Sequence, residues 1–319
     1  MRLQELFDFC VQQGIANDPR GTEQVEKELA RTKKDYEKMS EKDKKYFDAD
    51  KLNNPYADTR ILYGDPHREI NSILIGVDME GPEVLLADRM RQTGKPVDLI
   101  IAHHPEGRAM AQFHEVMHMQ ADILASIGVS INVAEDILSE RIKEVERRVM
   151  PVNHNRAVDI ARLLDIPMVC IHTPTDNAVN TYLQKLMDEK KPYLLEDVVE
   201  ILMEIPEYQE AAQNNNPANV LIGAKKNRAG QVFVDMTGGT GGSKESFQYL
   251  ANTQVGTVVG MHIGEDHRKE AIKNHINVVI AGHISSDTLG INLMLDKLIA
   301  AKGPLEINAC SGFKRVSRN

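Results

Sequence analysis

The sequence predicts an α/β protein with mostly parallel strands, two lobes and a helical N-terminal extension. From about residue 60 onward, short apolar runs alternate with stretches of helical periodicity, the pattern expected for strands joined by crossover helices. Residues 1–50 differ, because alternating charges and good helix formers leave few apolar positions there. The polar, asparagine-rich segment at residues 210–220 is the best candidate for a seam between the lobes.

The extension over residues 1–50 is expected to be mainly helical. Its segment from Thr22 to Lys51 mixes acidic and basic residues densely, which favours helices with a solvated face over a specific binding arm. The remaining residues, 51–319, are expected to form one α/β unit that contains both lobes.

Six apolar runs predict buried strands. Runs of this kind, apolar along their whole length, are typical of parallel strands that are covered on both faces. The helical patterns between them include residues 81–94, 153–165 and 288–303. No repeat of 20 to 50 residues is evident. The predicted strands are residues 72–79, 97–104, 166–173, 231–239, 256–264 and 276–283.

Composition excludes several classes of protein. The chain has 319 residues, 42% of them hydrophobic, which is enough for a substantial core. Lys and Arg total 38 against 47 Asp and Glu, a net charge of -9. Binding to a nucleic-acid backbone requires a basic surface, so we expect no nucleic-acid partner.

The cysteines and the apolar segments bear on location. Cys10, Cys170 and Cys310 are far apart and form neither a disulfide framework nor a CxxC zinc motif. The first residues lack an apolar segment followed by a cleavage site, and no segment approaches the roughly 18 apolar residues of a membrane span. We therefore expect a cytoplasmic protein with no membrane partner.

Histidine and aspartate follow three of the predicted strands. Ligands of open α/β sheets collect beyond the carboxyl ends of strands, and imidazole with carboxylate is the donor set of Zn, Fe or Mn. The pattern therefore indicates a shared metal site. The residues are His103 and His104, which precede Pro105; His172 with Asp176; and His283 with Asp287.

The spacing is compatible with two ions. Adjacent residues of a strand face opposite sides, so His103 and His104 can serve one site only where Pro105 ends the strand. Ions of two-metal sites lie about 3.5–4 Å apart, a distance that the carboxylate of Asp176 or Asp287 can bridge. The alternatives are that each histidine is a hydrogen-bonded core residue and that each aspartate caps the helix that follows it.

Residues 113–120, FHEVMHMQ, contain the HExxH pattern of zinc peptidases. On a helix, His114 and His118 would lie one turn apart, with Glu115 as the general base. Only generic acids follow as a third ligand, so a peptidase is the least favoured interpretation. His114 can instead face the metal site as a proton shuttle, or both histidines can be structural.

The segment TGGTGGSKE, residues 237–245, fits neither glycine-rich phosphate fingerprint. It can present backbone N–H groups to an anion beside Lys244. A simple turn from strand to helix explains it equally well.

These ordered motifs resemble the Nif-three-like family, also called GTP cyclohydrolase I type 2 homologues. The resemblance covers about residues 58–300, and several motifs in the same order are more specific than any one of them. The motifs are the His-His-Pro turn, the later His-Thr-x-x-Asp, the glycine-rich segment TGGTGGSKESF, and the closing GMHIGEDHRKEAIKNHINVVIAGHISSD.

The resemblance implies a two-lobed fold, two metal ions and a toroidal homo-hexamer. His103, His104, Asp176, His283 and Asp287 would hold the ions. His172 would be an additional ligand or a hydrogen-bonding neighbour of a ligand, and His267 is similar to a histidine of the closing motif. Asp287 stands where the family usually has Glu, whose side chain is one methylene longer, so a monodentate role is an alternative to bridging for this carboxylate.

The function expected from these motifs is metal-dependent hydrolysis of a small phosphorylated or heterocyclic substrate. Two divalent ions would activate water, and His172 or His114 would shuttle protons. The alternative is a protein without enzymatic activity, either a ring-forming metal-binding scaffold or a metal chaperone.

Overall fold

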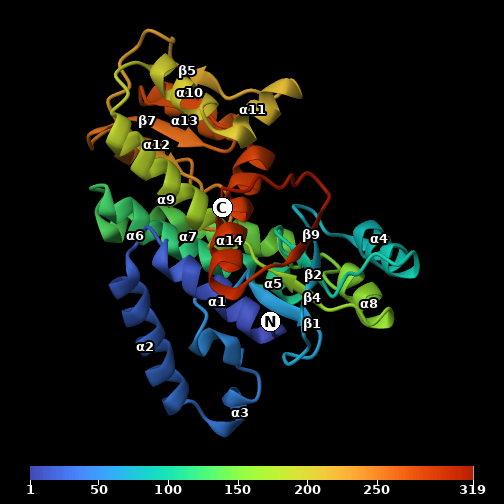
Figure 1. Ribbon diagram of the computed structural model, residues 1–319. Coiled ribbons are helices and arrows are strands. Elements are labelled where there is room, and N and C mark those ends of the chain that lie inside the picture. The colour runs from blue at the N-terminus through green and yellow to red at the C-terminus, as the bar shows by residue number, and fades with distance from the viewer. Residues whose placement is uncertain (319) are drawn as a thin grey trace.

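The computed structural model describes residues 1–318, and its strands form two separate sheets (Figure 1). All six predicted strands are present, with shorter bounds than the apolar runs. The first sheet has the order β1-β4-β3-β2-β9 and the second the order β5-β8-β7-β6. The strands are β1 Arg60–Tyr63, β2 Ser72–Gly76, β3 Leu99–Ala102, β4 Met168–Cys170, β5 Asn219–Ile222, β6 Gln231–Asp235, β7 Val255–Gly260, β8 Asn277–Ile280 and β9 Glu306–Ala309.

The two sheets repeat one topology. In the first sheet β2, β3 and β4 are parallel and β1 pairs antiparallel to β4. In the second sheet β6, β7 and β8 are parallel and β5 pairs antiparallel to β8. This structural repeat is much longer than the 20 to 50 residues over which we looked for sequence repeats. β9 adds a fifth, parallel strand to the first sheet.

Helices cover both sheets and fill the space between them. The long helices are α1 Leu3–Ala16, α2 Thr22–Lys38, α4 Gly81–Gln92, α7 Ile131–Val149, α9 Thr173–Lys190 and α14 His283–Lys302. The shorter ones are α3 Glu41–Lys44, η1 Ala49–Leu52, α5 Gly107–Ala111, η2 Phe113–His118, α6 Met119–Ser126, α8 Arg156–Leu163, α10 Leu195–Met203, α11 Pro206–Gln213, α12 Ser246–Leu250 and α13 Glu265–Lys273. No helix within residues 1–318 is long and apolar enough to cross a membrane.

Each of α9 and α14 packs against the sheet to which the strand before it does not belong. α9 follows β4 of the first sheet, yet Leu183 on α9 lies in the same apolar cluster as Val232 of the second sheet. α14 follows β8 of the second sheet, yet its Leu295 lies in the cluster of Ile73 of the first sheet. The two helices pack against each other in the middle of the molecule (Figure 1). The chain therefore passes between the lobes more than once, and a seam at residues 210–220 stays a prediction.

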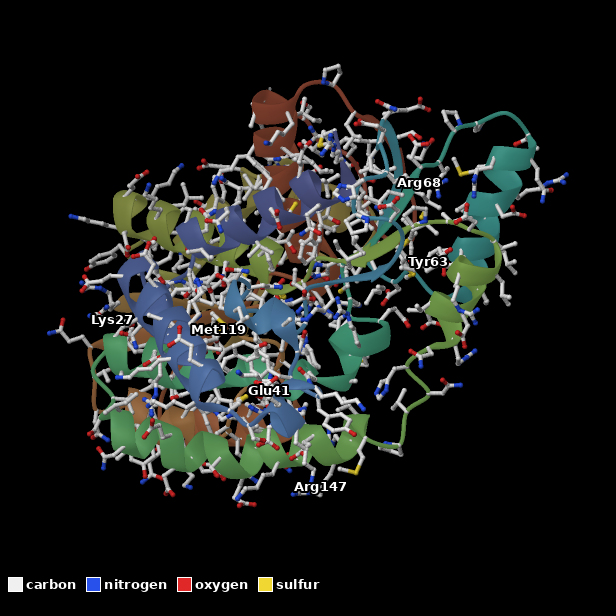
Figure 2. All side chains as sticks on the ribbon, turned by 90° about the horizontal axis from the view of Figure 1, so that it is seen from below. Lys27, Glu41, Tyr63, Arg68, Met119 and Arg147 are labelled. Atoms are coloured by element: carbon white, nitrogen blue, oxygen red, sulfur yellow. The ribbon has the colours of Figure 1, made fainter. Side chains whose placement is uncertain are left out.

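The N-terminal extension is helical, but its helices differ in environment. α1 packs against α9 and buries an apolar stripe that includes Leu3, Leu6 and Cys10. α2 buries only Val25. Lys27 on its outer side pairs with Glu23 one turn earlier and points into solvent (Figure 2). α1 is thus part of the core, whereas α2 has the solvated face expected from its charges.

Candidate metal centre

The three sequence motifs meet at one place, between the carboxyl ends of the two sheets. His103 and His104 directly follow β3. His172 and His283 lie at the start of α9 and α14. Asp176 is in the first turn of α9, and Asp287 follows His283 by four residues on α14. Neither aspartate is a helix cap, because the capping residues are His172 and Gly282. We call the assembly of His103, His104, His172, Asp176, His283 and Asp287 the His–Asp cluster.

Ligand atoms in this cluster are spaced as if around ions. Nε2 of His103 lies 3.6 Å from Oδ1 of Asp176 and 3.4 Å from Oδ1 of Asp287. Nε2 of His172 lies 3.6 Å from Oδ2 of Asp176. Charge-assisted hydrogen bonds measure about 2.7–2.9 Å, whereas ligands about 2.1 Å from one tetrahedral ion lie about 3.4 Å apart. These contacts are therefore longer than charge-assisted hydrogen bonds and suitable for a shared cation.

Asp287 lies between the two halves of the cluster. Its Oδ1 faces His103, and its Oδ2 lies 3.5 Å from Nε2 of both His104 and His283. Two three-residue groups able to hold a metal ion share this residue, one completed by His104 and His283, the other by His103 and Asp176. The shorter side chain of aspartate thus still reaches both halves.

Three of the imidazoles are oriented by partners behind them. Nδ1 of His104 contacts Oδ1 of Asp78 at 2.6 Å, and Nδ1 of His172 contacts Oδ2 of Asp58 at 2.8 Å. Because a carboxylate only accepts, each Nδ1 carries the proton and each Nε2 faces the cluster. Such outer hydrogen bonds are typical of histidines that bind metals.

His103 is oriented in the same way by a hydroxyl. Its Nδ1 lies 2.9 Å from Oγ1 of Thr175, which in turn donates to the backbone carbonyl of His172 at 2.7 Å. The single hydroxyl proton is then used, so Thr175 accepts from His103. The lone pair on Nε2 of His103 is directed into the cluster.

Several polar atoms of the cluster are buried without a partner. Nε2 of His103, Oδ1 of Asp176 and both carboxylate oxygens of Asp287 make no hydrogen bond within residues 1–318. Each unsatisfied buried polar atom costs about 1–3 kcal/mol, and more when charged. A divalent cation would satisfy all of these atoms, so the residues present fit a metal centre.

Comparison with known proteins bears on the fold. No family model and no curated protein sequence matches the chain. The solved structure of a NIF3 superfamily protein from Sphaerobacter thermophilus is similar to this chain with a TM-score of 0.69 and 27% sequence identity, over 80% of this chain and 91% of that chain. The chain has a NIF3-like fold, as the sequence motifs predicted.

Two further structures are similar over most of the NIF3-like chain. Reduced HcgD from Methanocaldococcus jannaschii has a TM-score of 0.47 and 16% identity, over 80% of this chain and 93% of that chain. A Bacillus cereus protein related to NIF3 has a TM-score of 0.42 and 12% identity, over 79% and 89% of the two chains.

Electrostatics in the NIF3-like cluster depends strongly on burial. Burial raises the pKa of Asp176 well above its usual range. Burial also opposes ionisation of Asp287, but His103 and His104 outweigh it and hold the pKa of Asp287 far below its usual range. For His104, Asp287 and Asp78 overcome the effect of burial and raise the pKa to about 9. Without metal, the cluster therefore holds a proton on His104 at neutral pH.

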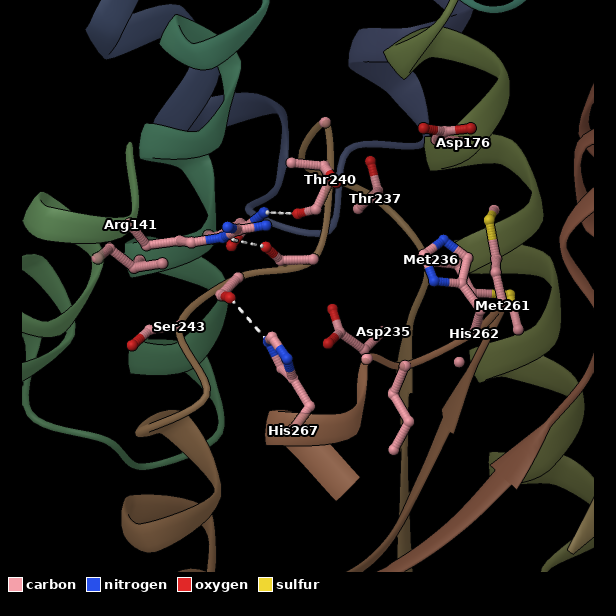
Figure 3. A pocket seen from close by; sticks show the side chains of 18 of the residues that line it. Arg141, Asp176, Asp235, Met236, Thr237, Thr240, Ser243, Met261, His262 and His267 are labelled. Carbon is pink, nitrogen blue, oxygen red and sulfur yellow. Dashed lines mark hydrogen bonds between the residues drawn. The ribbon is translucent and has the colours of Figure 1, made fainter. Parts of the chain in front are cut away.

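The cluster opens into a cavity of about 1300 Å³ (Figure 3). Carboxylate side chains outnumber arginine and lysine side chains along its wall. Asp235 lines it at the end of β6. Solvent reaches this side chain from the cavity, yet the surrounding protein raises the pKa of its carboxyl to about 6, against a smaller opposing effect of His267. The cavity is thus acidic and contains a carboxyl that can hold a proton close to neutral pH.

The glycine-rich segment forms one wall of this cavity and is held through its carbonyl groups. Gln120 on α6 donates to the carbonyls of Gly238 and Thr240 at 2.6 and 2.7 Å, and His267 on α13 lies 2.9 Å from that of Gly242. Gly238 has φ of +92°, and a Cβ there would lie 2.6 Å from Gln120. His267 therefore fixes this loop and is not part of the His–Asp cluster.

The HEVMH segment does not assemble a peptidase site. It forms the 3-10 helix η2 instead of an α-helix. His118 is exposed, and Nε2 of His114 lies 3.4 Å from its neighbour Glu115. Neither histidine belongs to a metal-capable group of the described residues or lines the cavity. The shuttle role predicted for His114 therefore has no structural support, whereas its neighbour Phe113 does line the cavity and contacts His172.

Sequence reasoning missed the residues that support the cluster. Asp58 is fully buried and also accepts from Thr173, so that His172 and Thr173 together lower its pKa against the effect of burial. No apolar run precedes Asp58, so the strand-end rule did not point to it. The same rule could have identified Asp78, because Asp78 is the second residue after the end of β2.

Proposed function

We propose that the protein binds two divalent metal ions in the His–Asp cluster and hydrolyses a small phosphorylated or heterocyclic substrate in the adjoining cavity. One ion would be held by His103, His172 and Asp176, the other by His104 and His283, with Asp287 between them. Imidazole and carboxylate donors favour Zn, Fe or Mn. Bound ions of this kind polarise substrate bonds and activate water for hydrolysis.

The observation that carries the proposal is the set of buried, unpaired donor atoms that face one another. A cluster with a purely structural role would pair these atoms with each other at hydrogen-bonding distance. Instead, Nε2 of His103 and both oxygens of Asp287 are unpaired, while hydrogen bonds behind the rings hold His103, His104 and His172 in place. Oriented ligands with an unsatisfied inner face are the arrangement that a metal centre requires.

Metal analysis of the purified protein tests the centre. We expect about two ions per chain, and a lower occupancy in Asp176→Ala, with unchanged secondary structure by circular dichroism. An occupancy near zero after reconstitution with Zn²⁺, Fe²⁺ and Mn²⁺ would contradict the proposal.

The acidic cavity limits the range of substrates that can bind. Its carboxylates repel a polyanion, so a phosphate group fits only where it contacts the ions. A heterocycle with little negative charge fits the rest of the wall. A panel of nucleotides, phosphoesters and cyclic amides should show turnover by the metal-loaded protein that His104→Ala abolishes. Tight metal binding with no turnover would favour the non-enzymatic metal-binding protein instead.

The hydrogen bonds that Asp58 and Asp78 accept from the metal-binding histidines give a second prediction, a partial loss of metal affinity. Asp58→Asn and Asp78→Asn should each lower metal affinity by about 10–100-fold, because an amide orients the imidazole less well than a carboxylate. Competition with a chromophoric chelator measures this. Asp159→Asn, an exposed change on α8, is the control and should leave affinity unchanged. Equal affinities in all three variants would argue against His172 and His104 as ligands.

Metal affinity should rise with pH. The pKa of His104 is raised to about 9 in the metal-free protein, so at lower pH an ion must first displace a proton. Each pH unit below that value should weaken binding about tenfold for this one group. Calorimetry in buffers of different ionisation enthalpy should record proton release at pH 7 that disappears above pH 9. A flat affinity between pH 7 and 9 would contradict a ligand role for His104.

Self-association into a homo-hexamer, as the family resemblance implies, is a further part of the proposal. α4 and α8 pack against each other and expose Leu85 and Leu163, at 55% and 75%. Exposed apolar residues of this size are common at subunit contacts. Light scattering should give a mass about six times that of the 35.7 kDa chain.

We also propose a cytoplasmic location. Cys10, Cys170 and Cys310 are all free thiols, and thiols persist in reducing compartments.

A further inference from the structure

The His–Asp cluster is accessible from one side only. The side chains of His103 and Asp287 are each 1% exposed, and that of His172 is 6% exposed. His104 is 28% exposed and His283 40%. The open side of the cluster is therefore the side of His104 and His283, and His283 is its most exposed member.

His262 lies at this open side. It lines the cavity beside Met261 (Figure 3), and its ring centroid is 4.8 Å from that of His283. The same separation joins His103 and His172 within the cluster. The side chain of His262 is exposed to the cavity and makes no hydrogen bond or ion pair to any of residues 1–318. An imidazole with free nitrogen atoms thus stands next to the most exposed histidine of the cluster.

The repeated topology gives His262 a counterpart among the cluster residues. β3 and β7 occupy equivalent places in their sheets. His104 is the second residue after the end of β3, and His262 is the second residue after the end of β7. The two halves of the fold therefore place a histidine at the same position, one inside the cluster and one at its margin.

His262 is not a resident member of the cluster. It belongs to none of the metal-capable groups of the described residues, so a change of side-chain orientation is needed before it can share an ion with His283. An exposed side chain without hydrogen bonds makes such a change at little cost. The acidic wall of the cavity raises the local concentration of cations in front of it.

We propose that His262 is an exchangeable ligand that transfers divalent metal ions between the cavity and the His–Asp cluster. The proposal rests on the metal centre proposed above. An ion from the cavity binds His262 first and passes to His283 and Asp287, and it leaves by the reverse route. His262 thereby sets the rate of metal exchange without setting the number of ions bound.

Metal-exchange kinetics test this role. Metal-free wild type, His262→Ala and His262→Gln are mixed with Zn²⁺ to follow loading, and the loaded proteins are mixed with a chromophoric chelator to follow release. His118→Ala is the matched control, because His118 is an exposed histidine that does not line the cavity. We expect loading and release to slow by about tenfold in both His262 variants, the scale found when a partner of a metal site is removed. Final occupancy should equal that of wild type, and His118→Ala should exchange at the wild-type rate.

The outcomes separate this proposal from the one on which it rests. If wild type binds no ions, the metal centre fails and the role of His262 fails with it. If wild type binds two ions and the His262 variants exchange them at the wild-type rate, the centre stands and the transfer role is wrong. A lower final occupancy in both His262 variants would make His262 a resident ligand and would also overturn the transfer role.

Discussion

Asp287→Asn should remove both metal ions from the protein. The substitution keeps the shape of the side chain, but a neutral amide has one acceptor oxygen and cannot serve both halves of the cluster. Metal analysis should fall from about two ions per chain to near zero. Asp176→Asn should do less, because Asp176 contacts only the half formed by His103 and His172.

Thermal stability gives an independent measure of the same effect. A ligand present at 100 times its dissociation constant stabilises the folded state by about 2.7 kcal/mol, so added metal should raise the melting temperature of wild type and not that of Asp287→Asn. Asp266→Asn, in the same cavity and 68% exposed, should behave like wild type. Retention of two ions by Asp287→Asn would exclude the bridging role.

Arg60→Met should cause the largest loss of stability, about 3–5 kcal/mol. Arg60 is 1% exposed, pairs with Asp48 at 2.9 Å and donates to the backbone carbonyls of Tyr56 and Thr59. Methionine fills much of the space but leaves a partly buried carboxylate and two carbonyls without a donor. Urea unfolding measures the change in the free energy of unfolding.

Arg108→Met is the matched control for this experiment. Arg108 contacts the acidic residues Asp48 and Asp50, but its side chain is 51% exposed. Exposed ion pairs contribute about 0–1 kcal/mol. If both variants lose the same stability, burial does not explain the role of Arg60. Arg60→Met should also weaken metal binding, because Arg60 holds the segment that carries Asp58.

The sequence predicted the strands with apolar, buried centres and missed three of the four strands at sheet edges. The six apolar runs correspond to β2, β3, β4, β6, β7 and β8, most of which are buried along much of their length. The strands that were missed, β1, β5 and β9, lie at sheet edges and are largely half-exposed or exposed. Their residues need not be apolar, so periodicity carries little signal for them.

In the candidate site, too, residues marked by local sequence features were predicted, and residues that only the fold brings together were not. His103, Asp176 and Asp287 were found because they follow apolar strands, a local feature. Asp58 lies 114 residues before His172, and only the folded chain brings the two together. In α1, the apolar spacing of Leu3, Leu6 and Cys10 was visible, but the charged residues of α2 obscured it when residues 1–50 were considered as one segment.

The crossing of α9 to the second sheet and of α14 to the first bears on how the two lobes can move. A hinge that parted the lobes would have to separate α9 from α14, which pack against each other, although Leu183 and Leu295 would stay on the sheets that their helices cover. The packing of α9 against α14 therefore opposes opening of the lobes. Small rearrangements of single side chains and loops then give access to the buried aspartates at a lower cost in free energy than separation of the lobes.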